Sequence, residues 1–398
     1  MDTRWENGIY TVFLCNRIDA VNAPQVEVEL LEALKAAEQK EKSELVLDAV
    51  NLTYISSAGL RALLALSEAT KNRIRILNVC HEVYYIFDMT GFTELFDISR
   101  TPREVSVEGC QVIGKGGFGT VYRLGNDKIL KLYNSSHTFG EIERERILAR
   151  EAFVSGIPSV ITYDTVRCGD SFGIVFEMLR ADTLGHAFAS SPDKTEEYVE
   201  RYVDFVKRLH EIPINSRAFT QLKTTLHNRV PSLASICSEE ELTLLHSLID
   251  SIPDSNTLVH GDLHPGNIML RGKDFILIDL PDSSVGSKVW DVISLFRDLI
   301  VGPRNIPEAI EKSTGIPIDQ IPGIGRAFFT RYLGARNDAV LQRYFGLLMP
   351  LFALNTVLFA GAPSDPSQYV PDDQVKMMMK QAIVPNEELI RQALKMFS

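Results

Sequence analysis

The sequence predicts two folded parts in one chain, a small α/β sandwich followed by a larger α+β domain with two lobes. In the first hundred residues, strand-like apolar runs alternate with amphipathic helical segments, which is the pattern of an α/β sandwich. After a short polar stretch, β-rich segments come first and long helical segments follow, as in an α+β domain. The length of 398 residues also exceeds what one hydrophobic core usually organises.

Composition and charge narrow the classes of function. A hydrophobic content of 45% and a charged content of 23% are typical of a folded soluble protein. The net charge of −11, with no basic run, argues against a nucleic-acid partner. The N-terminus has no apolar leader, and Pro350 and Asn355 interrupt the most apolar late stretch, 344–361, which is too short to span a membrane and is predicted to be a core helix. Five scattered cysteines form no CxxC pair, so neither a zinc site nor a disulfide framework is expected. We expect a cytoplasmic protein without a membrane partner.

The first part of the chain is expected to follow a strand–helix alternation in three rounds. β-Forming residues favour strands at 8–15, 45–47 and 74–79, and helical spacing of apolar residues favours helices at 23–38, 60–70 and 83–89. Such a unit is small but large enough to fold on its own.

A serine-containing turn starts the second of these helices. The run Leu47–Arg61, with Ser56-Ser57-Ala58-Gly59-Leu60 near its end, resembles the signature of STAS domains, the anti-anti-sigma-factor family, over residues 1–100. The resemblance implies an anti-sigma-type protein partner and a regulatory phosphorylation site at Ser57. A phosphate there would meet the free N–H groups and the dipole of a helix N-terminus. Alternatively, Ser56 or Ser57 only caps the helix.

A boundary between the two parts is expected at 101–107. This segment is polar, contains a proline and shows no hydrophobic period. The expected organisation is therefore a first domain at 1–100, a linker at 101–107 and a second domain at 108–398. The resemblance described below implies that the second domain has a small lobe at 108–180 and a large lobe at 181–398.

A glycine-rich motif opens the second part. Gly114, Gly116, Gly119 and Val121 form a GxGxxGxV pattern that is followed by β-formers rather than by a helix, which disfavours a dinucleotide-binding fold. The pattern is typical of the hairpin that covers ATP phosphates in kinases. Lys131 then lies in an apolar strand, where its charge is costly unless anions pair with it; the alternative is an edge strand with the lysine facing water.

Several acidic residues are candidate partners for that lysine. The next predicted helix, 139–155, carries Glu141, Glu143, Glu145 and Glu151. After it, 172–179 is predicted to be a buried strand with a polar exit.

The segment Leu258–Leu270 combines two apolar runs with a short polar centre. That centre holds Asp262 and Asn267, and Asp279 ends the next apolar run. An aspartate that serves as a base, together with an asparagine and an aspartate that hold a metal, is the residue set of phosphoryl transfer. Of the two histidines in the centre, His260 is expected to order the loop, and His264 to pack or to contact phosphate.

The order His-Gly-Asp-x-His-x-x-Asn and the later Ile-Asp-Leu-Pro resemble the aminoglycoside phosphotransferase and choline kinase branch of kinase-like folds, over 106–398. The resemblance implies that Asp262 accepts the proton of the attacking hydroxyl or orients it, and that Asn267 and Asp279 hold Mg²⁺. It also implies that Asp291 is structural and that Lys131 holds the ATP phosphates.

The resemblance assigns two further features of the ATP site. The spacing before Pro158 favours Glu145 as the partner of Lys131, with Glu151 in reserve. The strand 172–179 corresponds to the hinge, so the backbone of Glu177 and Leu179 is expected to meet the adenine.

These expectations combine into an ATP- and Mg²⁺-dependent phosphotransferase with a regulatory STAS domain, acting on a protein serine, including Ser57 itself, or on a small-molecule hydroxyl. One alternative is a small-molecule kinase of the aminoglycoside or choline type. The other is a pseudokinase that binds an anti-sigma-type partner through its STAS domain. The complete set of catalytic residues favours an enzyme.

Overall fold

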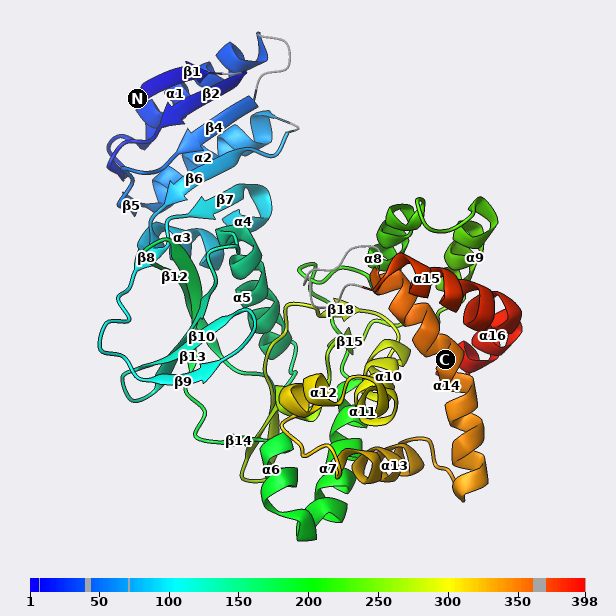
Figure 1. Cartoon of the computed structure of the whole chain (residues 1–398). Helices are drawn as coiled ribbons and strands as arrows, with labels where there is room; N and C mark the ends of the chain where they lie inside the picture. Colours follow the sequence, from blue (N-terminus) through cyan, green and yellow to red (C-terminus); the bar gives the residue numbers. More distant parts are fainter. Residues whose placement is uncertain (7, 40–43, 71, 361–369, 398) are drawn as a thin grey trace. The chain divides into compact units, whose positions relative to one another are not determined.

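The computed structural model describes residues 1–6, 8–39, 44–70, 72–360 and 370–397. They divide into two compact units: Met1–Glu108 with Thr165–Phe172, and Gly109–Asp164 with Gly173–Ser398 (Figure 1). Within the first unit, β8 (Arg103–Glu104) pairs in parallel with Val166 and Arg167. The stretch expected as a linker thus contains a short strand.

The first unit is an α/β sandwich, as its sequence predicted. Its sheet has the strand order β1-β2-β4-β6-β7, in which only the β1–β2 pair is antiparallel. The strands are β1 (Asp2–Glu6), β2 (Ile9–Phe13), β4 (Glu44–Asp48), β6 (Arg75–Val79) and β7 (Asp97–Arg100), beside the short pair β3 (Arg17–Ile18) and β5 (Tyr54–Ile55). The helices are α1 (Ala23–Glu38), α2 (Ser57–Ala69), α3 (His81–Met89) and α4 (Phe92–Leu95).

Apolar periodicity explains how this unit holds together. α1 buries Leu30 and Leu34 on one face, and α2 buries Leu63 and Leu66. These side chains form one cluster with Leu47 of the central strand β4. Each leucine removed from water in this way stabilises the fold by about 2 kcal/mol.

The small lobe of the second unit is built on an antiparallel sheet. β10 pairs with β9 and β11, and β11 pairs with β13, so β11 is an interior strand. The elements are β9 (Val112–Lys115), β10 (Gly119–Leu124), β11 (Lys128–Tyr133), α5 (Phe139–Val154), β12 (Thr162–Cys168) and β13 (Ser171–Glu177). The end of β12 and the start of β13 lie within the stretch Thr165–Phe172 that is counted with the first unit. A complete capping box, formed by Thr138 and Glu141, starts α5.

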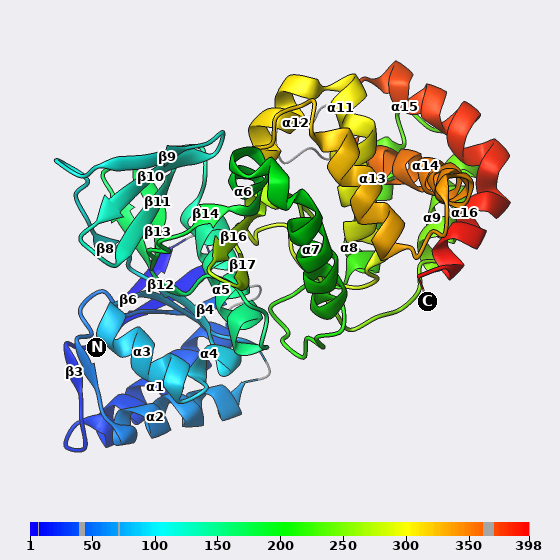
Figure 2. The ribbon, with the colours of Figure 1, turned by 90° about the horizontal axis from the view of Figure 1, so that it is seen from below.

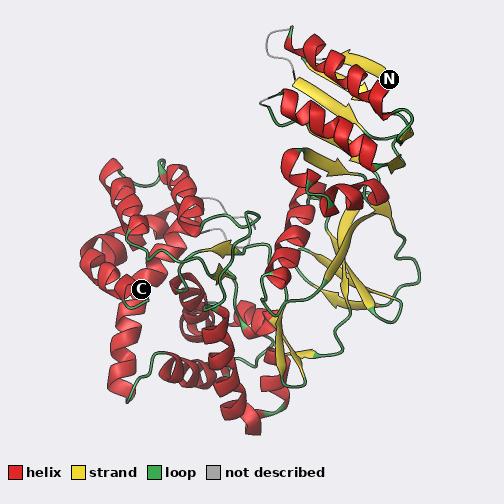
Figure 3. Ribbon diagram, turned by 180° about the vertical axis from the view of Figure 1, so that it is seen from behind, coloured by secondary structure: helices red, strands yellow, loops and turns green. Residues whose placement is uncertain are grey.

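The large lobe is mainly helical, as Figures 2 and 3 show. Its helices are α6 (Leu184–Ser190), α7 (Thr195–Leu209), α8 (Leu222–Arg229), α9 (Glu239–Asp250), α10 (Val289–Phe296), α11 (Gly302–Asn305), α12 (Pro307–Thr314), α13 (Ile321–Tyr332), α14 (Asp338–Ala360), α15 (Asp372–Met378) and α16 (Glu387–Lys395). Its short strands are β14 (Asp182–Thr183), β15 (Leu258–Val259), β16 (Ile268–Arg271), β17 (Asp274–Leu277) and β18 (Ser284–Val285). Single turns include the 3₁₀ helices η1 (Pro192–Lys194), η2 (Val230–Leu233), η3 (Pro265–Asn267) and η7 (Val384–Asn386), and the π-helical η4 (Arg297–Val301) and η6 (Met379–Ile383).

The helix α14 contains the late apolar stretch. It is 23 residues long, starts before the predicted stretch and continues through Pro350. By length and composition it could cross a membrane, and half of its most apolar window is buried inside the protein. Leu351, Leu354 and Leu358 belong to the core of the large lobe, as the prediction of a core helix requires. The expectation that this segment is too short to span a membrane was wrong, because the helix that contains it begins at Asp338 and is 23 residues long.

Candidate active site

The loop between β15 and η3 is held by one buried carboxylate. Asp291, on the first turn of α10, is fully buried and accepts hydrogen bonds from the backbone N–H groups of His260 (3.0 Å) and Gly261 (2.8 Å). His210, which follows the last turn of α7, contacts the same carboxylate with Nε2 at 3.0 Å. These contacts suit the structural role expected for Asp291.

Gly261 allows the chain to turn at this point. Its φ of +87° lies in the left-handed region, and a Cβ atom there would stand 2.9 Å from the carbonyl oxygen of Asp282. A side chain would therefore be both strained and crowded.

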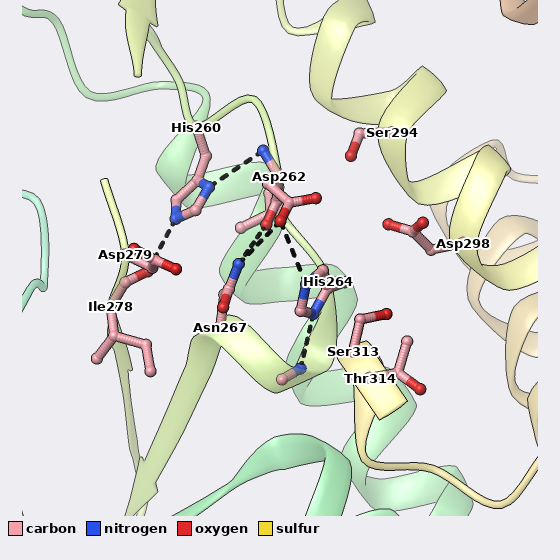
Figure 4. A network of polar contacts seen from close by, with 12 residues as sticks. His260, Asp262, His264, Asn267, Ile278, Asp279, Ser294, Asp298, Ser313 and Thr314 are labelled. Carbon is pink, nitrogen blue, oxygen red and sulfur yellow. Dashed lines mark hydrogen bonds and ion pairs between the residues drawn. The ribbon is translucent and has the colours of Figure 1, made fainter. Parts of the chain in front are cut away.

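His260 links the loop to the strand that carries Asp279. Its ring is fully buried, its Nε2 lies 3.2 Å from the carbonyl oxygen of Ile278, and its Nδ1 accepts a hydrogen bond from the backbone N–H of Asp262 (3.3 Å; Figure 4). Both ring nitrogens are therefore used in positioning the loop, which fits the ordering role that was expected.

Asp262 is surrounded by hydrogen-bond donors (Figure 4). Its Oδ1 accepts from Arg297 at 2.7 Å, and its Oδ2 lies 3.3 Å from both His264 Nε2 and Asn267 Nδ2. Burial alone would raise the pKa of Asp262, but the hydrogen bond from His264 and the charges of His264 and Arg297 outweigh it. The pKa of Asp262 therefore lies well below its usual value, and the carboxylate is ionised at neutral pH.

His264 has a more definite place than the sequence suggested. It is buried, its Nδ1 accepts from the backbone N–H of Gly266 (3.1 Å), and its Nε2 faces Asp262. Burial would lower the pKa of His264, but the hydrogen bond to Asp262 and its charge raise it. The ring is therefore a direct partner of Asp262.

Arg297 was missed by sequence reasoning. It begins the π-helical turn η4 directly after α10 and contacts Asp298 at 2.7 Å and Asp262 at 2.7 Å. One signal was available: Arg297 and Asp298 follow directly after α10, in which every residue is buried. Charged side chains in such a setting need partners of opposite charge. The sequence alone gives no indication of which partner.

Lys131 lies on the interior strand β11 and forms two ion pairs. Its Nζ is 2.6 Å from Asp279 and 3.1 Å from Glu145. Burial would lower the pKa of Lys131, but the two carboxylates outweigh it, and the ammonium stays charged. Burial raises the pKa of Glu145 against the opposing effect of Lys131. The structure thus pairs Lys131 with Glu145 rather than Glu151 and excludes the water-facing edge position.

The antiparallel pairing of β16 with β17 brings Asn267 beside Asp279. Asn267 immediately precedes β16, and Ile278 N–H donates to the carbonyl oxygen of Asn267 (3.0 Å) just before Asp279. Asn267 Nδ2 donates to the backbone oxygen of Asp262 (2.9 Å), so its Oδ1 is not used in this contact. Asp279 itself has a φ of +64°, which is rare for a residue other than glycine and is a strained conformation that often marks a functional site.

A metal at this point would rest on these two residues. In the described part of the chain, no three or more His, Cys, Asp or Glu side chains gather in a way that could hold a metal. In nucleotide sites, Mg²⁺ usually takes one or two protein ligands together with phosphates and waters.

The glycine-rich motif forms the β9–β10 hairpin. A Cβ at Gly119 would stand 2.1 Å from the carbonyl oxygen of Leu132, so strand packing alone requires this glycine. At Gly116, by contrast, a Cβ would meet no atom within 4 Å. Gly114 faces Val121, which stands opposite Lys131 in the β10–β11 register. Packing therefore explains the glycine at position 119 but not the one at position 116.

The predicted hinge lies at the end of β13. Glu177 N–H donates to the carbonyl oxygen of Ile161 (3.0 Å), and its carboxylate accepts from Ile161 N–H (2.9 Å). Leu179 lies just beyond the strand and is half-buried. Of the Glu177 backbone, the carbonyl oxygen is the group that an adenine would use.

The two serines at the start of α2 differ in their surroundings. Ser56 is the N-cap, and its side-chain oxygen accepts from Gly59 N–H at 3.4 Å. Ser57 is the first helical residue and is exposed. The capping role thus belongs to Ser56, which leaves the Ser57 hydroxyl accessible.

Comparisons with known proteins agree with this division. Residues 109–315 match the model of the phosphotransferase enzyme family (APH), and residues 1–105 match the STAS domain. A protein of Bordetella bronchiseptica described as an anti-sigma factor antagonist, BtrV, is 30% identical over 98 residues, which are 24% of this chain and 81% of that protein.

Solved structures with a similar fold include kinases of small molecules. A choline/ethanolamine kinase family protein from Mesorhizobium loti is 15% identical, with coverage of 72% of this chain and 92% of its own and a TM-score of 0.43. The ADP-bound aminoglycoside phosphotransferase APH(2'')-Ib is 17% identical, with coverage of 80% and 99% and a TM-score of 0.42.

The fold and the paired charges around Lys131 and Asp262 define a kinase-like enzyme that carries a second, α/β domain. The chain belongs to the phosphotransferase enzyme family, and its N-terminal domain is a STAS domain related to anti-sigma factor antagonists.

Proposed function

We propose that the protein is an ATP- and Mg²⁺-dependent phosphotransferase controlled by its STAS domain at 1–100. The observation that carries the proposal is the meeting of Lys131, Glu145 and Asp279 beside the loop that holds Asp262. Two regions far apart in the sequence supply these charges, Lys131 with Glu145 and Asp262 with Asp279, and they are the parts that kinase-like phosphoryl transfer uses.

Asp262 would receive the acceptor hydroxyl. Because the pKa of Asp262 is held low, its carboxylate is ready to accept the hydrogen bond of that hydroxyl and to direct its oxygen at the phosphorus. Arg297 and His264 keep the carboxylate in one orientation. They act on it as positioning residues.

Asn267 Oδ1 and the Asp279 carboxylate would hold Mg²⁺, which neutralises charge on the transferred phosphoryl group. Lys131 would hold the ATP phosphates and remain paired with Glu145, under the hairpin of Gly114, Gly116, Gly119 and Val121. The carbonyl oxygen of Glu177 and the backbone of Leu179 would meet the adenine.

For the acceptor we favour a protein serine, with Ser57 as the first candidate. Ser57 is exposed at a helix N-terminus, where a phosphate is favourable, and its neighbour Ser56 supplies the cap. The relationship to an anti-sigma factor antagonist supports an anti-sigma-type partner for this domain. Gly261 stands where protein kinases carry an arginine, so control by the STAS domain replaces control by a phosphorylated loop. We place the protein in the cytoplasm.

Phosphosite mapping tests this proposal. The full chain is incubated with Mg-ATP and mapped by mass spectrometry, alongside Asp262→Asn and Ser57→Ala. We expect phosphate on Ser57 in the wild type and none in Asp262→Asn. Equal labelling of Ser57 in both proteins would contradict transfer by this site.

A small-molecule hydroxyl is the second acceptor class, supported by the family to which residues 109–315 belong. ADP release measured over a panel of amino-alcohols, sugars and aminoglycosides separates the two classes. ADP release that needs a panel compound and leaves Ser57 unmodified assigns the enzyme to small molecules. Nucleotide binding without any turnover would instead indicate a signalling pseudokinase.

A further inference from the structure

A pocket in the large lobe is lined by His210, whose Nε2 contacts the buried carboxylate of Asp291. It has a volume of about 510 Å³, within the range of small-molecule sites. The ends of α7 and α13, which pack side by side (Figure 2), form part of its wall, together with α14 and residues that follow α16. Its polar lining consists of Lys207, His210, Glu211, Lys288, Tyr332 and Tyr344.

The pocket carries positive charge. Among the described residues, neither Lys207 nor Lys288 has a carboxylate partner, and the Lys207 ammonium lies 5.8 Å from the centre of the Tyr332 ring. Glu211 is exposed, and among the described residues of the lining it is the one that carries a carboxylate. Two surface lysines alone would show nothing, because lysines are commonly solvated.

His210 supplies the independent observation. It is 7% exposed, and its buried Nδ1 has no hydrogen-bond partner among the described residues. Its Nε2 must carry the proton, because the Asp291 carboxylate opposite it already accepts two backbone N–H groups and is an acceptor only. A buried ring nitrogen without a partner is unusual, and His210 is one of the residues that line this pocket.

We propose that this pocket binds a small organic anion, whose carboxylate or phosphate group lies between Lys207 and Lys288 and accepts a hydrogen bond from His210 Nδ1. Donation from Nδ1 to the anion and from Nε2 to Asp291 requires a proton on each ring nitrogen. Tyr332 and Tyr344 add hydroxyl groups to the lining, and the volume leaves room for more than the anionic group alone.

The same contacts connect the pocket to the catalytic loop. An anion on His210 strengthens the charge opposite Asp291, which holds the N–H groups of the two residues before Asp262. Binding of an anion in the pocket should therefore affect the hydrogen bonds by which Asp291 holds the catalytic loop. This connection to catalysis depends on the proposed function, whereas binding to the pocket does not.

Isothermal titration calorimetry of the full chain tests the site. Inorganic phosphate and citrate are titrated separately at constant ionic strength, without added Mg²⁺ and with a non-hydrolysable ATP analogue present to occupy the predicted nucleotide site. We expect one site per chain for at least one probe. Phosphate binding without citrate binding assigns the pocket to phosphates, and the reverse assigns it to carboxylates.

Variants locate the binding. Lys207→Ala/Lys288→Ala should weaken the affinity at least tenfold, since two charged donors are lost. His210→Gln should do the same, because glutamine keeps a donor toward Asp291 but has no equivalent of Nδ1. The matched control Lys194→Ala/Lys376→Ala, which removes two exposed lysines elsewhere, should bind as the wild type does.

The result that overturns the proposal is a lack of saturable binding by either probe, or binding that Lys207→Ala/Lys288→Ala leaves unchanged. If His210→Gln proves unfolded by circular dichroism, the double lysine variant decides alone. Binding is measured by heat, so a protein that transfers no phosphate still gives a clear answer, and failure of the proposed function is seen separately in the phosphosite map.

Discussion

The candidate active site contains two groups of charged residues. Sequence motifs predicted the first group, whereas the second was found only in the structure. The first, Lys131 with Glu145 and Asp279, joins residues that ordered motifs had already marked. The second joins Asp262 to Arg297, which no motif marked. A charged residue inside an apolar strand, such as Lys131, must have a partner of opposite charge, and the order of the sequence motifs indicates which residue that is. Arg297 lies on an irregular helical turn outside any motif, so the sequence does not indicate its partner.

The largest effect is expected from removing the carboxylate of Asp262, which belongs to the second group. Asp262→Asn should lower kcat about 10³-fold, because the amide cannot accept the proton of the acceptor hydroxyl. Turnover is followed by ADP release. Asp274→Asn, which changes an exposed acid at the start of β17, should keep near wild-type kcat. Full activity in Asp262→Asn would remove the second group from the mechanism.

The first group is tested by Lys131→Met. We expect kcat/KM for ATP to fall about 10²-fold, because a positioned charge on the phosphates is lost. Lys128→Met is the matched control on the same strand, where the ammonium lies 4.8 Å from the centre of the Tyr163 ring. Similar losses in both variants would show that the strand, rather than the ion pairs, matters.

Arg297 should act through the pKa of Asp262. Arg297→Gln removes a charge that lowers this pKa, so the pKa rises and the acid limb of the kcat/KM profile moves to higher pH. We expect a loss of roughly tenfold at neutral pH from poorer positioning. Arg297→Lys keeps the charge but not the forked contact to Asp262 and Asp298, so its acid limb should stay in place. An unmoved limb in Arg297→Gln would contradict the coupling.

The pair of Asp262 and His264 should make stability depend on pH. The lowered pKa of Asp262 contributes stability above the unfolded value of about 3.9, which is lost as pH falls through the folded pKa. The raised pKa of His264 contributes stability below about 6.5, which is lost as pH rises through the folded pKa. Urea unfolding should therefore show the largest deficit of His264→Asn near pH 5, roughly 1 kcal/mol. A deficit independent of pH would indicate packing alone.

The smallest effect is expected in the STAS domain. Ser56→Ala removes the cap of α2 and should cost about 0.5 kcal/mol, because the hydrogen bond is long at 3.4 Å. Hydrogen exchange of the Gly59 amide should become faster. Ser57→Ala should leave that exchange unchanged, which separates the cap from the proposed phosphate acceptor.

Much of the fold followed from periodicity. The helix predicted at 23–38 is α1 (Ala23–Glu38), and the predicted fold class is confirmed. The edge strand β1 was missed because Asp2–Glu6 is polar and exposed along its length, so it shows no apolar signal.

In the candidate active site, too, some contacts could be predicted from the sequence and others could not. The pairing of β16 with β17 makes the closeness of Asn267 and Asp279 a consequence of strand order, which a sequence pattern can indicate. The contact between Asp262 and Arg297 depends on the turn η4, where the helix widens to a π-helix, and local propensity does not specify that geometry. At Gly119, strand packing by itself already requires the glycine that the motif assigned to phosphates, so the two explanations coincide at this position.

The buried carboxylate of Asp291 also bears on how the large lobe unfolds. It binds one group at the end of α7 and two on the loop, while itself belonging to α10. Pulling any one of these segments away leaves a charge unsolvated in the core, so they should separate together or not at all. The amides of His260 and Gly261 would then exchange with solvent only through global opening of this lobe, and they would report its full free energy of unfolding.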